Sequence, residues 1–309
     1  MIKEVVRNIY IKTRRIALPV VKYINTHNLI REYDKVYGRD KYIVIFPPQG
    51  LGDILACCCG VEYLERQGKK VIILVNKKYF ADIAAFFPQD YLTIHFTKKW
   101  FSEKTYKNYM PLSHKMYFPK HPYISMKHNI CLAMDISPKV IFHNHYKINK
   151  NFEGLPLIKE NKTVFLSPFA TSCKDELDYK FWDELANKLQ NNGFDVLFNA
   201  PLDSYYSNNY RTCLLNLEDT VELVSRCGYF IGWRSGLCDI IGMFANAKII
   251  VIYPKNPSIS PYLYIPAGMS STEAFMNSCS LKTIWDKNAI EIINNKDLLN
   301  QIYKEIDEK

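Results

Sequence analysis

Three short stretches of the sequence combine glycines with side chains that can do chemistry. The first is "PPQGLGD" (47–53), in which Gly50 and Gly52 precede Asp53. An Asp at the start of a helix either caps the helix or presents its carboxylate as a general base for a hydroxyl group. This stretch alone leaves both interpretations open, because a G-x-G without the full G-x-G-x-x-G is a weak nucleotide signal.

The second stretch, "SPFATSCKDELDYKFW" (167–182), lies between a strand-like and a helix-like run. Thr171 and Ser172 offer hydroxyl groups, and Lys174 offers a cation. Hydroxyls, backbone N–H groups and a cation at a helix start can hold a phosphate. An ordinary solvated loop is the alternative interpretation.

The third stretch, "FIGWRSGLCD" (230–239), ends an apolar strand and starts a helix. Ser235 is a good N-cap residue, and Gly236 leaves the positive end of the helix accessible. Arg234 beside that end can bind a diphosphate bidentately. We therefore predict an anion site here, with Asp239 orienting Arg234 or binding a hydroxyl. The alternative is an Arg234–Asp239 pair that only braces the loop.

Metal-binding patterns are absent from the sequence. There is no D-x-D triplet, and the seven histidines show no metal-ligand spacing. We therefore expect neither a metal nor a cofactor. A departing diphosphate would then be neutralised by Arg, Lys and a helix terminus.

These stretches lie in a repeated strand–helix pattern, which predicts parallel sheets with crossover helices. The pattern starts near residue 41, breaks over 97–150 and resumes at 163. We predict an α/β protein with two Rossmann-like domains that face a cleft, because ligands bind beyond the carboxyl ends of such strands. The expected parts are an N-terminal domain, a C-terminal domain and a helical tail that can pack back on the N-terminal domain: 1–155, 161–285 and 286–309.

Composition narrows the function classes. The chain has 309 residues, is 48% hydrophobic and carries a net charge of +9, which argues against global disorder and for an anionic partner. Nine cysteines, three of them consecutive at 57–59, do not form a disulfide pattern, so we expect a reducing cytoplasm. We expect no signal peptide and no spanning segment. Residues 1–24 predict a basic amphipathic helix that Pro19 interrupts, and that lies either on an anionic membrane or on its own domain.

Together, the three stretches resemble the GT-B-fold glycosyltransferases, most closely the heptosyltransferase family (glycosyltransferase family 9). The similar segments are "GLGDIL", the unit from "LSPFATSCKDELDYKFW" to "NAP", and the unit from "LVSRCGYF" to "VIYP"; they fall within 41–90 and 163–254. The resemblance implies a metal-independent, inverting sugar transfer. It implies that Asp53 is the base, that Thr171 and Ser172 meet the donor phosphates, and that Lys174 or Lys180 is the nearby lysine.

Two positions depart from the family pattern. Arg234 stands where the family has Asp before Ser-Gly, and Asp239 stands where it has His. The Arg-Ser-Gly turn is similar to that of some fucosyltransferase-like enzymes, where an Arg holds the diphosphate of GDP. The donor sugar therefore stays open.

The sequence thus predicts a glycosyltransferase that uses a nucleotide-sugar donor and a glycan or glycolipid acceptor of bacterial lipopolysaccharide or capsule. Its expected place is the cytoplasm, at the inner face of the membrane. One alternative is a sugar-nucleotide epimerase of the same architecture. Another is a non-catalytic basic protein that binds a membrane or nucleic acid, although no nucleic-acid motif is present.

Overall fold

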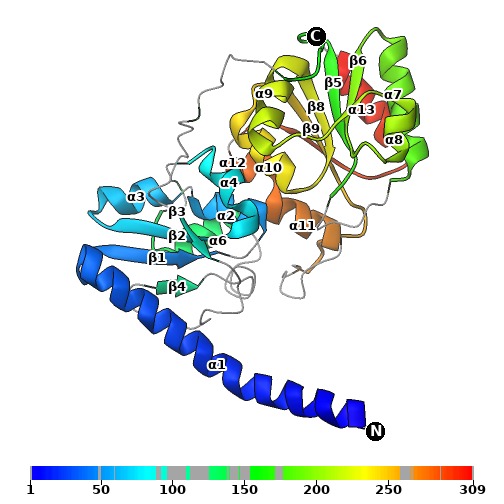
Figure 1. Ribbon diagram of the computed structural model, residues 1–309. Helices are drawn as coiled ribbons and strands as arrows, with labels where there is room; N and C mark the ends of the chain where they lie inside the picture. Colours follow the sequence, from blue (N-terminus) through cyan, green and yellow to red (C-terminus); the bar gives the residue numbers. More distant parts are fainter. Residues whose placement is uncertain are drawn as a thin grey trace.

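Two parallel β-sheets organise the chain, and each half of the sequence builds one of them (Figure 1). The computed structural model describes residues 2–47, 50–58, 60–87, 92–95, 109–111, 125–137, 139, 146, 154–170, 177–257, 265, 267–285 and 287–307. The predicted pair of Rossmann-like α/β halves is confirmed.

The N-terminal sheet has the strand order β3-β2-β1-β4, and all its pairs are parallel. The strands are β1 (Tyr42–Phe46), β2 (Lys70–Asn76), β3 (Leu92–His95) and β4 (Tyr109–Pro111). The helices of this half are α1 (Ile2–Tyr37), α2 (Leu51–Cys58), α3 (Val61–Arg66), α4 (Lys77–Ala84) and α6 (Met126–Ala133). Every residue of β1 is buried, as expected of a central parallel strand rich in β-branched and aromatic residues.

The C-terminal sheet has the order β10-β9-β8-β5-β6-β7, again all parallel. Its strands are β5 (Thr163–Ser167), β6 (Asp195–Asn199), β7 (Thr212–Cys213), β8 (Gly228–Trp233), β9 (Lys248–Tyr253) and β10 (Ile290–Ile293). Its helices are α7 (Tyr179–Asn191), α8 (Tyr205–Asn209), α9 (Leu217–Cys227), α10 (Gly236–Phe244), α11 (Ser271–Cys279), α12 (Leu281–Trp285) and α13 (Leu298–Asp307). In chain order this sheet reads 3-2-1-4-5-6 from β7 to β10, so the strand order reverses between β5 and β8. Ligands of such sheets bind at this switch point, beyond the carboxyl ends of the strands.

The tail differs from the expectation of a helix that packs back on the N-terminal domain. Residues 286–309 contribute the edge strand β10 as well as α13. The buried residues Ile302 and Ile306 of α13 pack in the same cluster as Val164 and Trp182 of the C-terminal half. The prediction of packing back is therefore wrong: the apolar face of α13 covers its own sheet. It is α12 that contacts α6 of the N-terminal half.

The first helix also differs from the expectation, because it continues through Pro19 to Tyr37. A proline inside a helix costs about 3 kcal/mol. The last turns of α1 offset this cost by packing Leu29, Ile30, Tyr33 and Tyr37 against a buried cluster on the N-terminal sheet. Of the helices described, none combines the length and the apolar content that a bilayer-spanning segment needs.

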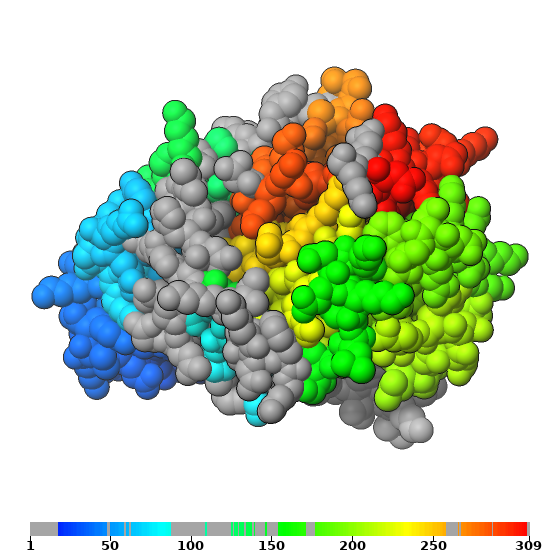
Figure 2. All heavy atoms as spheres, turned by 90° about the horizontal axis from the view of Figure 1, so that it is seen from above, coloured from blue at the N-terminus to red at the C-terminus, as the bar shows by residue number. Residues whose placement is uncertain are grey.

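The two halves share one continuous core at their junction. Phe86 stacks on Phe244 with ring centroids 4.4 Å apart, and Tyr146 donates a 2.8 Å hydrogen bond to Glu222. α2 contacts α10 across the junction. In Figure 2, α11 and α12 (orange) lie between the blue N-terminal half and the green and red C-terminal half. The first turns of α2 and α10, which follow the carboxyl ends of β1 and β8, therefore lie in contact.

Candidate active site at the junction of the two sheets

Asp53 is the third residue of α2, rather than the N-cap residue that precedes the helix. Its side chain is partly exposed. A Cβ on Gly50 would lie 2.6 Å from Asp53 Oδ2, so the carboxylate folds back over the turn that leads from β1. The glycine at position 50 makes room for it. A carboxylate in the first helical turn is also stabilised by the helix dipole.

Ser235 and Gly236 form the start of α10, as the sequence predicts. Ser235 is the N-cap residue, with extended backbone angles, and its side chain makes no cap hydrogen bond. Gly236 is the first helical residue and is only partly buried. A Cβ on Gly236 would lie 3.0 Å from Leu51 Cβ. The start of α10 thus packs directly on the turn that carries Asp53.

Arg234 points into the protein and is only 5% exposed. Its Nη1 and Nη2 donate to the two carboxylate oxygens of Asp239 at 2.9 and 2.8 Å. The other donations go to the carbonyl of Ser235 (from Nη1) and the carbonyl of Cys279 (from Nε and Nη2). All five N–H groups of the guanidinium are therefore used within the protein.

The prediction that Arg234 forms an open anion site is therefore wrong for this structure. The bracing pair of Arg234 with Asp239 is the arrangement that the structure adopts, and Asp239, 2% exposed, orients Arg234 rather than facing a ligand. Burial opposes the charge on Arg234, but Asp239 and other neighbours raise the pKa of Arg234 well above its ordinary value. The guanidinium stays charged.

Two partners of this pair escaped sequence analysis. Trp285 of α12 donates from Nε1 to Asp239 Oδ1 at 3.1 Å. Cys279 is the last residue of α11, and its carbonyl accepts a hydrogen bond from the guanidinium of Arg234. Both lie more than 40 residues from Arg234 along the chain. No local motif marks them; a Trp on a short amphipathic helix is the only signal in the sequence.

Gly52 brings Asp53 beside the ion pair. A Cβ on Gly52 would lie 2.5 Å from Asp239 Oδ2, so only a glycine allows this approach of the two turns. Burial raises the pKa of the Asp239 carboxyl, Arg234 and the hydrogen bond from Trp285 lower it, and the nearby charge of Asp53 raises it further. The site thus joins a partly exposed carboxylate to a buried ion pair through one glycine.

The loop after β5 is only partly described. The side chain of Asn199 donates to the hydroxyl of the buried Ser167 at 3.2 Å, which ties the ends of β5 and β6 together. The predicted phosphate ligands of this loop lie outside the described residues: Thr171, Ser172 and Lys174. Lys180 is described and is exposed in the first turn of α7.

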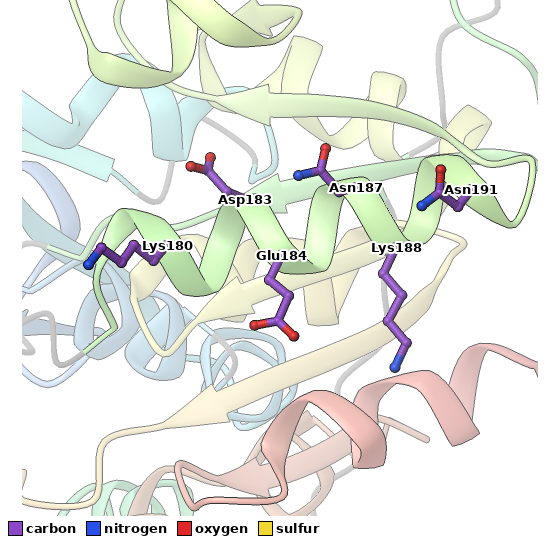
Figure 3. A pocket seen from close by; sticks show the side chains of 6 residues that line it. All are labelled: Lys180, Asp183, Glu184, Asn187, Lys188 and Asn191. Atoms are coloured by element: carbon purple, nitrogen blue, oxygen red, sulfur yellow. The ribbon is translucent and has the colours of Figure 1, made fainter.

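Lys180 also borders a surface hollow of about 520 Å³, shown in Figure 3. Asp183, Glu184, Asn187, Lys188 and Asn191 line the rest of it. All these side chains come from α7 and their charges are mixed, so the hollow is a groove along one helix. It does not bring together groups from the strand ends, and we place no site there.

Exposed aromatic rings gather at the carboxyl ends of β5 and β6, which sequence analysis did not find. Phe169 follows β5, Tyr179 begins α7, and Tyr205 begins α8; all three are exposed. The rings of Tyr179 and Tyr205 lie 4.7 Å apart, and Tyr206 contacts both Tyr205 and Phe169. Flat rings at this edge can stack against a planar ligand group.

The described residues contain no cluster of three or more His, Cys, Asp or Glu side chains placed to hold a metal ion. The seven cysteines described are free thiols. The expectation of a metal-free site stays a prediction.

Known proteins resemble this chain in structure alone. No family model matches the sequence, and no curated protein matches it. A family 9 glycosyl transferase from Veillonella parvula aligns with a TM-score of 0.54 and 11% identity, over 87% of this chain and 90% of its own. E. coli heptosyltransferase WaaC with ADP aligns with a TM-score of 0.53 and 13% identity, over 86% of this chain and 99% of its own. E. coli ADP-heptose lps heptosyltransferase II aligns with a TM-score of 0.50 and 11% identity, over 86% of this chain and 97% of its own.

The chain has the fold of these glycosyltransferases. The alignments run over nearly the whole length of each of them, so both halves and their junction are included. The predicted resemblance to heptosyltransferases is confirmed at the level of the fold.

Proposed function

We propose that this chain is an inverting glycosyltransferase that moves a sugar from a nucleotide-sugar to a hydroxyl group of a bacterial surface-glycan acceptor, in lipopolysaccharide or capsule synthesis. One observation carries the proposal. Asp53 is a partly exposed carboxylate at the carboxyl edge of one sheet, and the neighbouring residues Leu51 and Gly52 pack against the start of α10 at the switch point of the other. The proteins of known structure that share this fold include a heptosyltransferase and a family 9 glycosyl transferase, which agrees with the proposal.

Asp53 acts as the general base. Its carboxylate takes the proton from an acceptor hydroxyl, and the hydroxyl oxygen attacks the anomeric carbon of the donor. A new C–O bond forms as the bond from the anomeric carbon to the diphosphate oxygen breaks. The electron pair leaves with the diphosphate. Attack from the opposite face inverts the configuration.

The diphosphate lies at the start of α10, between Gly236 and the loop after β5. The partial positive charge of that helix end favours an anion. Ser235, Thr171 and Ser172 offer hydroxyl groups, and Lys174 or Lys180 supplies the cation. Arg234 and Asp239 act as positioning residues that fix the first turn of α10. The departing charge is neutralised without a metal ion.

The nucleotide lies in the C-terminal half, which would place its base at the exposed rings of Phe169, Tyr179 and Tyr205. One structure with this fold holds ADP. Aromatic stacking accepts any base, so this edge does not select one. The acceptor binds on the side of the N-terminal half, and the reaction takes place in the cytoplasm, at the inner face of the membrane.

A thermal-shift screen of GDP, UDP, ADP and CMP, each with its sugar conjugates, tests the donor class. We expect one nucleotide to raise the melting temperature, in buffer with EDTA as well as without it. Product analysis then separates the reaction types: a transferase releases nucleotide only with an acceptor, whereas an epimerase converts the sugar without one. Salt-sensitive RNA binding with no shift from any nucleotide would overturn the proposal.

A further inference from the structure

Within the part of α1 whose side chains are described, the last turns pack on the N-terminal sheet through apolar contacts. The docked residues are Leu29, Ile30, Tyr33 and Tyr37. At about 1.5 Å per residue, the helix before Leu29 extends roughly 40 Å. Figure 1 shows this part projecting past the carboxyl ends of the N-terminal strands, with the amino terminus away from both sheets.

Large apolar side chains face solvent on the projecting part. Val20 is 55% exposed, Tyr23 52% and Ile24 48%. These positions are three and four residues apart, so they share one face of the helix. We call Val20, Tyr23 and Ile24 the apolar stripe. The same spacing continues in the sequence toward the amino end: Ile2, Val5, Val6, Ile9 and Ile16.

The apolar stripe is not the docked face. At 3.6 residues per turn, its centre lies about a third of a turn around α1 from the centre of Leu29, Ile30, Tyr33 and Tyr37. The docked residues cover one side of the helix, and the stripe is left on another. Packing of α1 on its own sheet therefore does not account for the stripe.

The charge of the same segment identifies what covers the stripe. Residues 1–24 carry six basic residues and one acidic residue, Glu4. The basic residues are Lys3, Arg7, Lys12, Arg14, Arg15 and Lys22. A second copy of this helix would bring like charges together, and a nucleic acid would leave the apolar stripe exposed. An anionic lipid surface matches both features, because a basic amphipathic helix buries its apolar face among acyl chains and its cations among headgroups.

We propose that α1 lies on an anionic lipid bilayer, with the apolar stripe buried in the interface. The part of the chain that carries Asp53 is then held at the membrane. The proposal does not depend on the proposed enzymatic activity, since it concerns the helix and its charge alone.

Sedimentation of the full-length chain with vesicles tests it. The vesicles are phosphatidylcholine alone, or phosphatidylcholine mixed with phosphatidylglycerol. We expect binding to the mixed vesicles that weakens as salt is added, and little binding to the neutral ones. A variant with Val20→Glu and Ile24→Glu should bind the mixed vesicles at least about tenfold more weakly.

Val36→Glu is the matched control, because Val36 is 69% exposed on the same helix but lies off the stripe. It should bind as the unmodified chain does, and unchanged melting temperatures should confirm that all variants fold. Equal binding by the stripe variant, or equal loss in Val36→Glu, would overturn the proposal. So would a dimer in sedimentation velocity that the stripe variant abolishes, or RNA binding without vesicle binding.

Discussion

Asp239 Oδ2 lies 2.5 Å from the point that a Cβ on Gly52 would occupy, although the two residues belong to different halves of the chain. This approach places the first turn of α2 on the ion pair at the start of α10. Because Asp53 follows Gly52 directly, the position of the proposed base depends on that pair. The contact between the two halves therefore fixes where the proposed base lies.

Gly52→Ala should push the two turns apart. The new methyl group meets Asp239, whose carboxylate is fixed by Arg234 and Trp285 and cannot move aside. We expect a loss of roughly 1–3 kcal/mol in the free energy of unfolding, measured by urea denaturation. Gly60→Ala is the control: its Cβ would lie 2.7 Å from Met134 Cε and 2.8 Å from Ile136 Cδ1, the ends of two aliphatic side chains that no hydrogen bonds hold in place. Equal losses in both variants would contradict the special role of Gly52.

Arg234→Ala and Asp239→Ala should each lower the free energy of unfolding by about 3–5 kcal/mol, because each leaves one buried charge without its partner. The double variant Arg234→Met with Asp239→Leu should lose less than the two single losses added together. Glu160→Ala removes the partner of Arg226 in an exposed ion pair and should cost at most about 1 kcal/mol. If the Arg234→Ala protein keeps its stability but loses nucleotide affinity, Arg234 binds the anion directly, as the sequence predicted.

Trp285→Phe should destabilise the junction between α12 and α10, because it removes the hydrogen bond to Asp239. Trp182→Phe is its control: within the described residues, the buried Nε1 of Trp182 has no hydrogen-bond partner. Both substitutions remove similar volume. In thermal denaturation, the free energy of unfolding of Trp285→Phe should therefore be lower than that of Trp182→Phe by about 1–3 kcal/mol. The opposite order would show that Asp239 does not depend on Trp285.

Local sequence was sufficient to predict the two sheets and the loops that meet at their junction. Runs such as 41–46 and 248–254 are rich in β-branched residues, and glycines or helix caps mark the turns that follow. Ser235 as N-cap and Gly236 as the first residue of α10 came from the same rules. Such features depend on neighbours within a few residues.

The direction of the Arg234 side chain could not be predicted in this way. It is set by the carbonyl of Cys279 and by Trp285, which only the packing of α11 and α12 brings to it. The path of α1 through Pro19 likewise depends on distant contacts, those of Tyr33 and Tyr37 with the sheet. The tail from residue 286 was expected to be helical, and its strand β10 forms by pairing with β9.

The central claim is that Asp53 removes a proton from the acceptor. The most direct measurement compares Asp53→Asn with the unmodified enzyme, using the nucleotide-sugar that the screen identifies, for both turnover and nucleotide affinity. We predict that turnover falls at least about 100-fold, while the nucleotide dissociation constant changes less than about twofold, because Asn keeps the shape of the side chain but cannot accept the proton. Retained turnover, or an equal loss of nucleotide binding, would contradict the claim.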